Sequence, residues 1–97
     1  MSINKPVKKV VRTIAAENLF TDSVEMKGYF NCSISGTWVA TVTIQRSFDS
    51  GSTWFDVKTF NLNSEEYGFE LEGGVLYRAG IKTGHFTSGE AVVRLSQ

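Results

Sequence analysis

The chain alternates apolar and polar residues with a period of two along most of its length. Between Tyr29 and Ser35, for example, Phe30, Cys32 and Ile34 alternate with residues of the opposite set. Successive side chains of a strand point to opposite faces, so this pattern is typical of a strand with one face on a core. No window of a dozen residues has the spacing of an amphipathic helix. The alternation therefore predicts an all-β domain.

Turn residues separate about seven or eight such runs, at a spacing typical of β-sandwiches. The runs cover residues 8–14, 19–27, 29–35, 38–48, 54–60, 66–72, 75–82 and 90–96. Gly73 and Gly74 predict a tight hairpin turn, and residues 83–89 predict a loop rich in Gly, Ser and Thr. The sequence therefore predicts a single antiparallel β-sandwich of immunoglobulin-like or jelly-roll type.

The alternation also assigns a face to each side chain, because the more apolar set of a run is expected on the core. In residues 38–48 that set is Trp38, Ala40, Val42 and Ile44. In residues 66–72 it is Tyr67, Phe69 and Leu71. The opposite sets are expected on solvated faces, and they include Thr43, Gln45, Glu66 and Glu70.

Composition is that of one folded domain. The 97 residues include seven Phe, three Tyr and two Trp, enough apolar surface for one core. Ten basic and ten acidic residues cancel, so no bulk charge favours nucleic acid or an anionic membrane. No apolar stretch approaches the length of a membrane span. We expect residues 1–7 to form a flexible N-terminal arm and residues 8–97 to form the sandwich domain.

Residue types that carry catalysis or bind metals are few. The single cysteine, Cys32, lies on a predicted core face, and the single histidine, His85, lies in a predicted loop. One Cys and one His cannot hold a structural zinc ion. Glu66, Glu70 and Glu72 are expected on one solvated strand face, whereas a glycosidase needs two carboxylates across a cleft. We therefore expect no catalytic residues, no metal and no cofactor.

Residues 47–54 match the pattern Ser-x-Asp-x-Gly-x-Thr-Trp, with Ser47, Asp49, Gly51, Thr53 and Trp54 at the named positions. The pattern resembles the Asp-box hairpin of sialidases and other β-propellers. The carboxylate can accept hydrogen bonds from backbone N–H groups, Gly51 can adopt a positive φ, and Trp54 can cover the turn. The motif occurs once, in a chain too short for a propeller, so it predicts a structural turn.

Eight further segments between Phe20 and Gln97 carry a wider resemblance. They are Gly28-Tyr29-Phe30-Asn31, Ser35-Gly36-Thr37-Trp38, Thr41-Val42-Thr43-Ile44-Gln45-Arg46-Ser47-Phe48-Asp49, Gly51-Ser52-Thr53-Trp54-Phe55-Asp56-Val57, Gly74-Val75-Leu76-Tyr77-Arg78, Ile81-Lys82-Thr83-Gly84, Thr87-Ser88-Gly89 and Val93-Arg94-Leu95-Ser96-Gln97. In these segments the chain is similar to small β-sandwich structural proteins of tailed bacteriophages, of the capsid decoration, fibre or adaptor type.

The resemblance implies a non-enzymatic component of a phage virion, foremost a capsid decoration or cement protein on the lattice of the major capsid protein. Such a protein is assembled in the host bacterial cytoplasm, binds other virion proteins and forms a homo-oligomer. The candidate partner-binding residues are those of the arm: Ile3, Asn4, Lys5 and Pro6. The alternative is a carbohydrate-binding or a tail or fibre adaptor module. Exposed coplanar Trp or Tyr rings would favour sugar, and a flat apolar patch would favour assembly.

Overall fold

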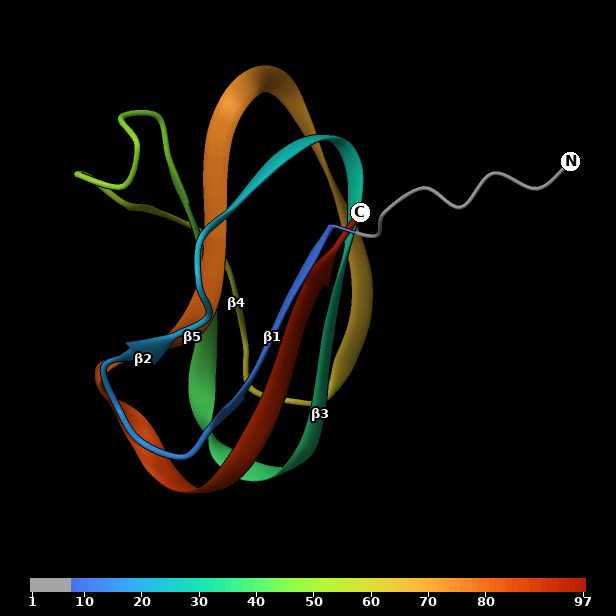
Figure 1. Cartoon of the computed structure of the whole chain (residues 1–97). Helices are drawn as coiled ribbons and strands as arrows, with labels where there is room; N and C mark the ends of the chain where they lie inside the picture. The colour runs from blue at the N-terminus through green and yellow to red at the C-terminus, as the bar shows by residue number, and fades with distance from the viewer. Residues whose placement is uncertain (1–7) are drawn as a thin grey trace, which may run out of the picture.

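β3 and β5 form one long antiparallel ribbon around which the chain is arranged (Figure 1). The structure, a computed structural model, describes residues 8–97. Its elements are β1 (Lys9–Ile14), β2 (Leu19–Phe20), β3 (Val24–Ser47), β4 (Phe55–Phe60) and β5 (Ser64–Ser96). Every strand pair is antiparallel, and the described residues form no helix. The predicted all-β antiparallel fold is confirmed, and its immunoglobulin-like or jelly-roll type stays a prediction.

β3 lies between two parts of β5 and so takes the central place in two layers of strands. In the first layer, residues 28–36 of β3 pair with residues 64–70 on one side and residues 91–96 on the other. β1 continues this layer beyond residues 91–96. In the second layer, residues 42–47 of β3 pair with β4 and with residues 76–81, and β2 lies beyond the latter. The sheet order is β1, β5, β3, β4, with β2 against β5.

The ribbon bends from the first layer to the second at a pair of glycines. Gly36 and Gly89 have positive φ angles of 104° and 86°. A Cβ atom on Gly36 would overlap the carbonyl oxygen of Glu90, and one on Gly89 would overlap that of Thr37. Glycine alone provides both the backbone angle and the space, so the two strands pass this corner in direct contact.

The hairpin turn predicted at Gly73 and Gly74 is wrong. The runs on either side of it do not pair with each other, because both pair with β3. The register shifts between Met26 and Gly28, and residues 71–74 are the extra length on the β5 side of that shift. The glycines therefore belong to the second corner of the ribbon, where the chain arches from one layer to the other (Figure 1).

The loop predicted at residues 83–89 is also wrong, because these residues continue β5. They pair with β3 on the way to the corner, with Trp38 opposite Gly89 and Ala40 opposite Phe86. Phe86 packs against the core. A long partner strand thus imposes strand geometry on a segment whose Gly, Ser and Thr content is typical of a loop.

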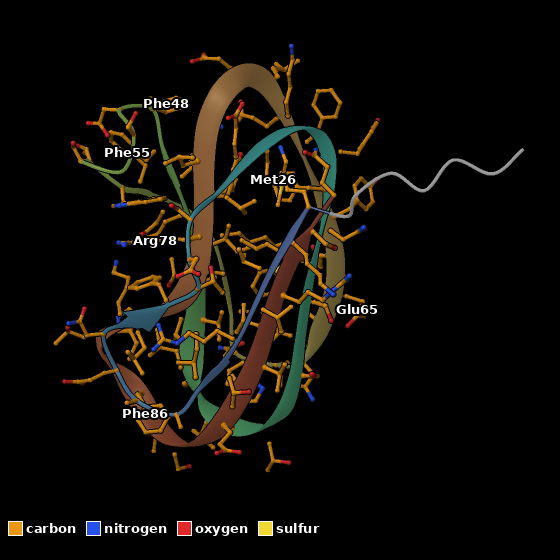
Figure 2. The ribbon with its side chains drawn as sticks, in the orientation of Figure 1. Met26, Phe48, Phe55, Glu65, Arg78 and Phe86 are labelled. Atoms are coloured by element: carbon orange, nitrogen blue, oxygen red, sulfur yellow. The ribbon has the colours of Figure 1, made fainter. Side chains whose placement is uncertain are left out.

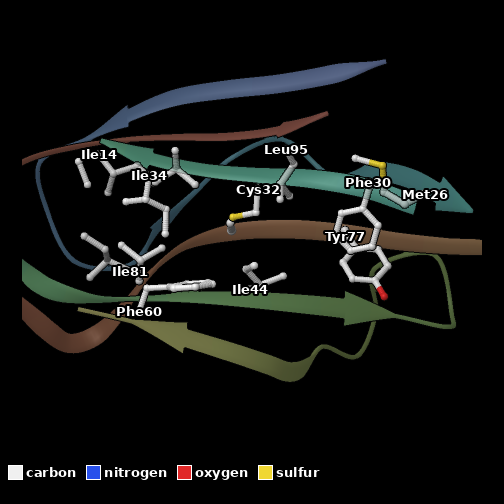
Figure 3. Close-up of a cluster of buried hydrophobic side chains, with 14 of the residues drawn as sticks. Ile14, Met26, Phe30, Cys32, Ile34, Ile44, Phe60, Tyr77, Ile81 and Leu95 are labelled. Atoms are coloured by element: carbon white, nitrogen blue, oxygen red, sulfur yellow. The ribbon is translucent and has the colours of Figure 1, made fainter. Parts of the chain in front are cut away.

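Side chains from both layers meet in one core (Figure 3). Its members are Ile14, Met26, Phe30, Cys32, Ile34, Val42, Ile44, Phe60, Val75, Tyr77, Ala79, Ile81, Ala91, Val93 and Leu95. The Phe30 and Tyr77 rings lie 4.7 Å apart between their centroids. Cys32 faces this core as predicted, and burial raises the pKa of its thiol to about 12. The thiol therefore stays protonated and serves as a small apolar side chain.

The face predicted to be solvated in the second half of β3 is buried instead. Thr43 is 0% and Gln45 6% exposed. The guanidinium of Arg78 lies 4.2 Å from the Phe20 ring centroid and 4.2 Å from that of Trp54. Its Nε donates a 2.9 Å hydrogen bond to Oε1 of Gln45. This stack covers the outside of the second layer with residues from distant parts of the sequence, which alternation within one strand cannot predict.

The faces predicted for residues 66–72 are reversed. Glu70, expected in solvent, is 4% exposed on the core side. The side chains expected in the core are exposed, namely Tyr67, Phe69 and Leu71. The reason lies at Gly68, because a Cβ atom there would lie 2.7 Å from Cζ of Phe30. The Phe30 ring therefore fills the core-side space that a larger residue at this position would need.

We expect Gly68→Ala to lower the free energy of unfolding by about 1–3 kcal/mol, because the added methyl group overpacks the core against Phe30. Gly73→Ala is the matched control, since its Cβ would meet nothing closer than Cδ of Lys27 at 3.8 Å. Urea denaturation of both variants measures the difference. Equal stability of the two variants would show that the Phe30 ring does not need this space.

Candidate functional site

Four exposed apolar side chains form a patch on the outer surface of the first layer. They are Tyr29, Tyr67, Phe69 and Leu71, with exposed fractions of 68%, 74%, 50% and 84%. Tyr29 comes from β3 and the other three from the neighbouring part of β5, where Tyr29 is the register partner of Phe69. We call this patch the aromatic face. Contiguous apolar surface on a folded domain is often functional, so the aromatic face is the candidate site.

The rings of the aromatic face pack on one another at steep angles. The centroids of Tyr29 and Phe69 lie 4.6 Å apart with an interplanar angle of 71°, in an edge-to-face contact. Tyr29 and Tyr67 lie 5.9 Å apart at 57°. These contacts fix the rings on a paired strand, so the patch needs little ordering when a partner binds. The face is rough rather than a flat stacking platform.

A partly buried polar network holds the strand of the aromatic face from its inner side. Tyr77 Oη donates a 2.6 Å hydrogen bond to Oε1 of Glu70, and Arg46 Nη1 lies 3.0 Å from the same oxygen. The backbone N–H of Glu72 donates to Oε2 at 3.0 Å. Arg46 belongs to the second layer and Glu70 to the first. The network therefore ties the two layers together beneath the aromatic face.

The ionisation of this network follows from its contacts. Burial raises the pKa of Glu70, but the hydrogen bonds from Tyr77, Glu72 and Arg46 outweigh it, so the pKa lies below its ordinary value. Burial and the bond to Glu70 raise the pKa of Tyr77 to about 12. At neutral pH the carboxylate is charged and the phenol is protonated, which is the state that the hydrogen bonds require.

A small cavity opens beside the aromatic face, between β4 and residues 64–70. These strands are neighbouring edges of the two layers and do not pair with each other. The volume is about 70 Å³, and the walls include Phe30, Cys32, Ile44 and Phe60. At its rim Lys58 Nζ lies 2.6 Å from Oε1 of Glu66. The space suits one apolar side chain and is far smaller than an ordinary ligand pocket.

The predicted turn residues lie together in the connection between β3 and β4. Oδ1 of Asp49 accepts hydrogen bonds of 2.8 Å from the Thr53 N–H and 2.8 Å from the Ser47 hydroxyl. Oγ of Ser47 in turn accepts the Gly51 N–H at 2.8 Å. Gly51 has a φ of 94°, and a Cβ on it would touch the Trp54 ring at 3.5 Å. The hydrogen bonds to the Asp49 carboxylate, first the one from the Thr53 N–H and then the one from Ser47, lower the pKa of Asp49 below its ordinary value.

The connection with this turn also carries a second exposed apolar group. Phe48 and Phe55 flank the turn with ring centroids 6.1 Å apart (Figure 2), and Val57 follows on β4. Arg46 stacks on Phe48 at 4.9 Å. The group lies next to the polar network of Arg46 and Glu70, so the turn is bound to the body of the domain through the same arginine.

The other candidates from the sequence form no site among residues 8–97. The arm residues Ile3, Asn4, Lys5 and Pro6 lie outside the described residues. No three His, Cys, Asp or Glu side chains of the described part of the chain are grouped to hold a metal ion. The described part of the chain contains no helix that is long and apolar enough to cross a membrane.

Comparison with protein-family models, with curated proteins and with solved structures finds no match for this chain.

The aromatic face was missed by sequence reasoning because alternation identifies two faces without saying which one is inside. Gly68 was the available signal, since a glycine in the middle of a strand marks a close approach of another group. Here that group is Phe30, and it identifies the inner face.

We expect Glu70→Gln to lower the free energy of unfolding at pH 7 by about 1–3 kcal/mol, because the charge-assisted hydrogen bonds are lost. A lowered folded-state pKa stabilises the fold above the unfolded value of about 4.3, and this contribution disappears as the pH falls through the folded value. The variant should therefore lose less stability than the wild type on acidification below about pH 5.

Urea denaturation at a series of pH values measures this prediction. Tyr77→Phe is the companion variant, since it keeps the carboxylate and removes one donor. It should be less stable at neutral pH and retain part of the acid dependence. Identical acid dependence of Glu70→Gln and wild type would contradict the assignment.

Proposed function

We propose that this protein is a non-enzymatic structural component of a phage virion, a decoration or cement protein that binds the lattice of the major capsid protein. Its partners are the major capsid protein or other virion proteins, together with further copies of itself, and it is assembled in the host bacterial cytoplasm. The observation that carries the proposal is the aromatic face, an exposed apolar patch on a rigid sheet. The resemblance of the sequence to small phage structural proteins supports the choice of partner.

The aromatic face has the composition of a protein-binding surface. Tyr and Phe are enriched at the centres of protein interfaces, where they bury large areas with few rotatable bonds. All four of its side chains are at least half exposed, and the largest apolar patch of a folded domain is often functional. Lys27 and Glu65 flank it on the same strand pair. Apolar groups within a polar rim are the usual arrangement at such interfaces.

The carbohydrate-binding alternative fits this surface less well. A sugar-binding sandwich stacks pyranose rings on exposed aromatic planes. Tyr29 is tilted by 57° to Tyr67 and by 71° to Phe69, so it forms a flat stacking surface with neither of them. Tyr67 and Phe69 instead offer edges and faces to an irregular partner, as protein side chains do.

The test is binding of the purified protein to capsids that lack it, followed by sedimentation. We expect saturable co-sedimentation at a fixed ratio to the major capsid protein. The double variant Tyr67→Ser and Leu71→Ser should bind at least about tenfold more weakly, because truncation of central apolar contacts costs about 1.4 kcal/mol or more.

Leu62→Ser is the matched control, since Leu62 is exposed at 74% but lies in the link between β4 and β5, away from the aromatic face. It should bind like the wild type. If the wild type fails to co-sediment, the capsid proposal falls, and a glycan array then tests the sugar alternative. If the double variant binds like the wild type, the aromatic face is not the capsid contact.

A further inference from the structure

The first layer ends in two free edges that carry opposite charges. β1 is one edge and residues 64–70 are the other, and each pairs with a single strand in the described structure. Figure 1 shows the four strands of this layer side by side, from β1 in blue to residues 64–70 in dark yellow. The basic edge carries Lys8, Lys9 and Arg12 and no acidic residue. The acidic edge and its extension carry the exposed residues Glu65, Glu66 and Glu72 and no basic residue, while Glu70 is buried and paired with Arg46.

The strand directions allow these two edges to meet between molecules. β1 is antiparallel to residues 91–96, those are antiparallel to β3, and β3 is antiparallel to residues 64–70. The layer therefore has four alternating strands, and its two edges run in opposite directions. When a second copy is placed beside the first in the same orientation, its β1 is antiparallel to residues 64–70 of the first. The ladder can thus continue across the junction without a change of strand sense.

We infer that copies of this protein assemble head to tail, with β1 of one copy added as a strand to residues 64–70 of the next. The inference rests on the proposed function, in which the chain is an assembly module, and it names the partner of these edges as a second copy. Addition of a strand to a free sheet edge is a common mode of protein recognition. It satisfies the unpaired backbone groups of both edges at once.

One register satisfies the side chains as well as the backbone. With Arg12 of one copy opposite Glu66 of the next, Val10 lies opposite Gly68 and Val11 opposite Tyr67. Val10 and Arg12 belong to the core-side set of β1, because their register partners Leu95 and Val93 are buried. Gly68 and Glu66 belong to the core-side set of their edge, so this register preserves the two faces.

The same register has consequences on each face. On the core side, Val10 covers the space beside Gly68 and the Phe30 ring that lies against it. On the outer side, Val11, which is half-exposed, extends the aromatic face beside Tyr67. Arg12 joins the ion pair of Lys58 and Glu66 at the rim of the cavity. Backbone, apolar and charged groups are then all matched.

Charge also excludes the competing arrangements. Pairing of β1 with β1 of another copy would bring Lys and Arg side chains together, and pairing of two acidic edges would bring Glu side chains together. Like charges directly opposite one another destabilise strand pairing. The junction is therefore heterologous, and repetition of it gives a closed ring or an open chain rather than a two-fold dimer.

The test uses two charge reversals of the full chain, Arg12→Glu and Glu66→Arg. Sedimentation velocity over a concentration series should show the wild type assembling, and each variant alone remaining monomeric, because Glu meets Glu or Arg meets Arg at every junction. An equimolar mixture of the two variants should assemble again, since every junction between unlike variants restores an Arg–Glu pair. Both residues are exposed, and their contacts within the molecule are surface ones, a hydrogen bond from Arg12 to the Phe20 carbonyl oxygen and the ion pair of Glu66 with Lys58. Because surface contacts contribute little, each variant should keep its thermal midpoint within a few degrees of the wild type.

Glu90→Arg changes the net charge as Glu66→Arg does, at an exposed residue outside both edges, and should assemble like the wild type. A wild type that is monomeric up to the millimolar range, or a mixture that stays monomeric while both variants are folded, would overturn the inference. Capsid co-sedimentation of the same samples separates the two proposals. Binding to capsids by a protein that never self-assembles removes the inference alone, and self-assembly without capsid binding removes the capsid proposal alone.

Discussion

The rest of the structure depends on the central place of β3, which pairs with several separate parts of β5. Residues 28–36 are enclosed by two separate parts of β5, and residues 42–47 lie between a third part and β4. Both layers therefore share one continuous strand. Most contacts in the core join residues far apart in sequence, so the chain must close long loops before the apolar burial stabilises it. The glycine corner at Gly36 and Gly89 is the constraint that makes this route available.

The sequence alone predicted the structure correctly in two kinds of place: where neighbouring residues determine the conformation, and in a strand that has partners on both sides. Phe30, Cys32 and Ile34 lie in a part of β3 that has a strand on each side, and all three are buried. Their apolar character alone was therefore enough to identify the inner face of this strand. The turn around Asp49 was predicted from a pattern, because the atoms that bond its carboxylate lie within four residues of it. Local hydrogen bonding of Asp and Ser needs no knowledge of the remaining fold.

The sequence was insufficient where a side chain is covered by a distant segment. Gln45 is buried because Arg78 bonds it and is itself held by two rings, a contact that strand alternation does not contain. Gly73 and Gly74 have the composition of a hairpin turn, but β3 pairs with the residues on both sides of them. In each case tertiary pairing overrides a valid local preference. The aromatic face was hidden for the same reason, since the partner that identifies its strand's inner side is Phe30, nearly forty residues away.

The reversed strand shows how an exposed apolar face can be stable. Its inner side offers a glycine and a carboxylate to the core, and neither provides a large apolar surface. Phe30 takes the space above Gly68, and Tyr77 and Arg46 satisfy Glu70, so the strand is held by shape and hydrogen bonding rather than by its own apolar residues. Its tyrosine, phenylalanine and leucine are thereby left free to face outward. If these residues faced the core instead, they would not be exposed to a partner. The polar network beneath the aromatic face is therefore part of the same arrangement as the function proposed for that face.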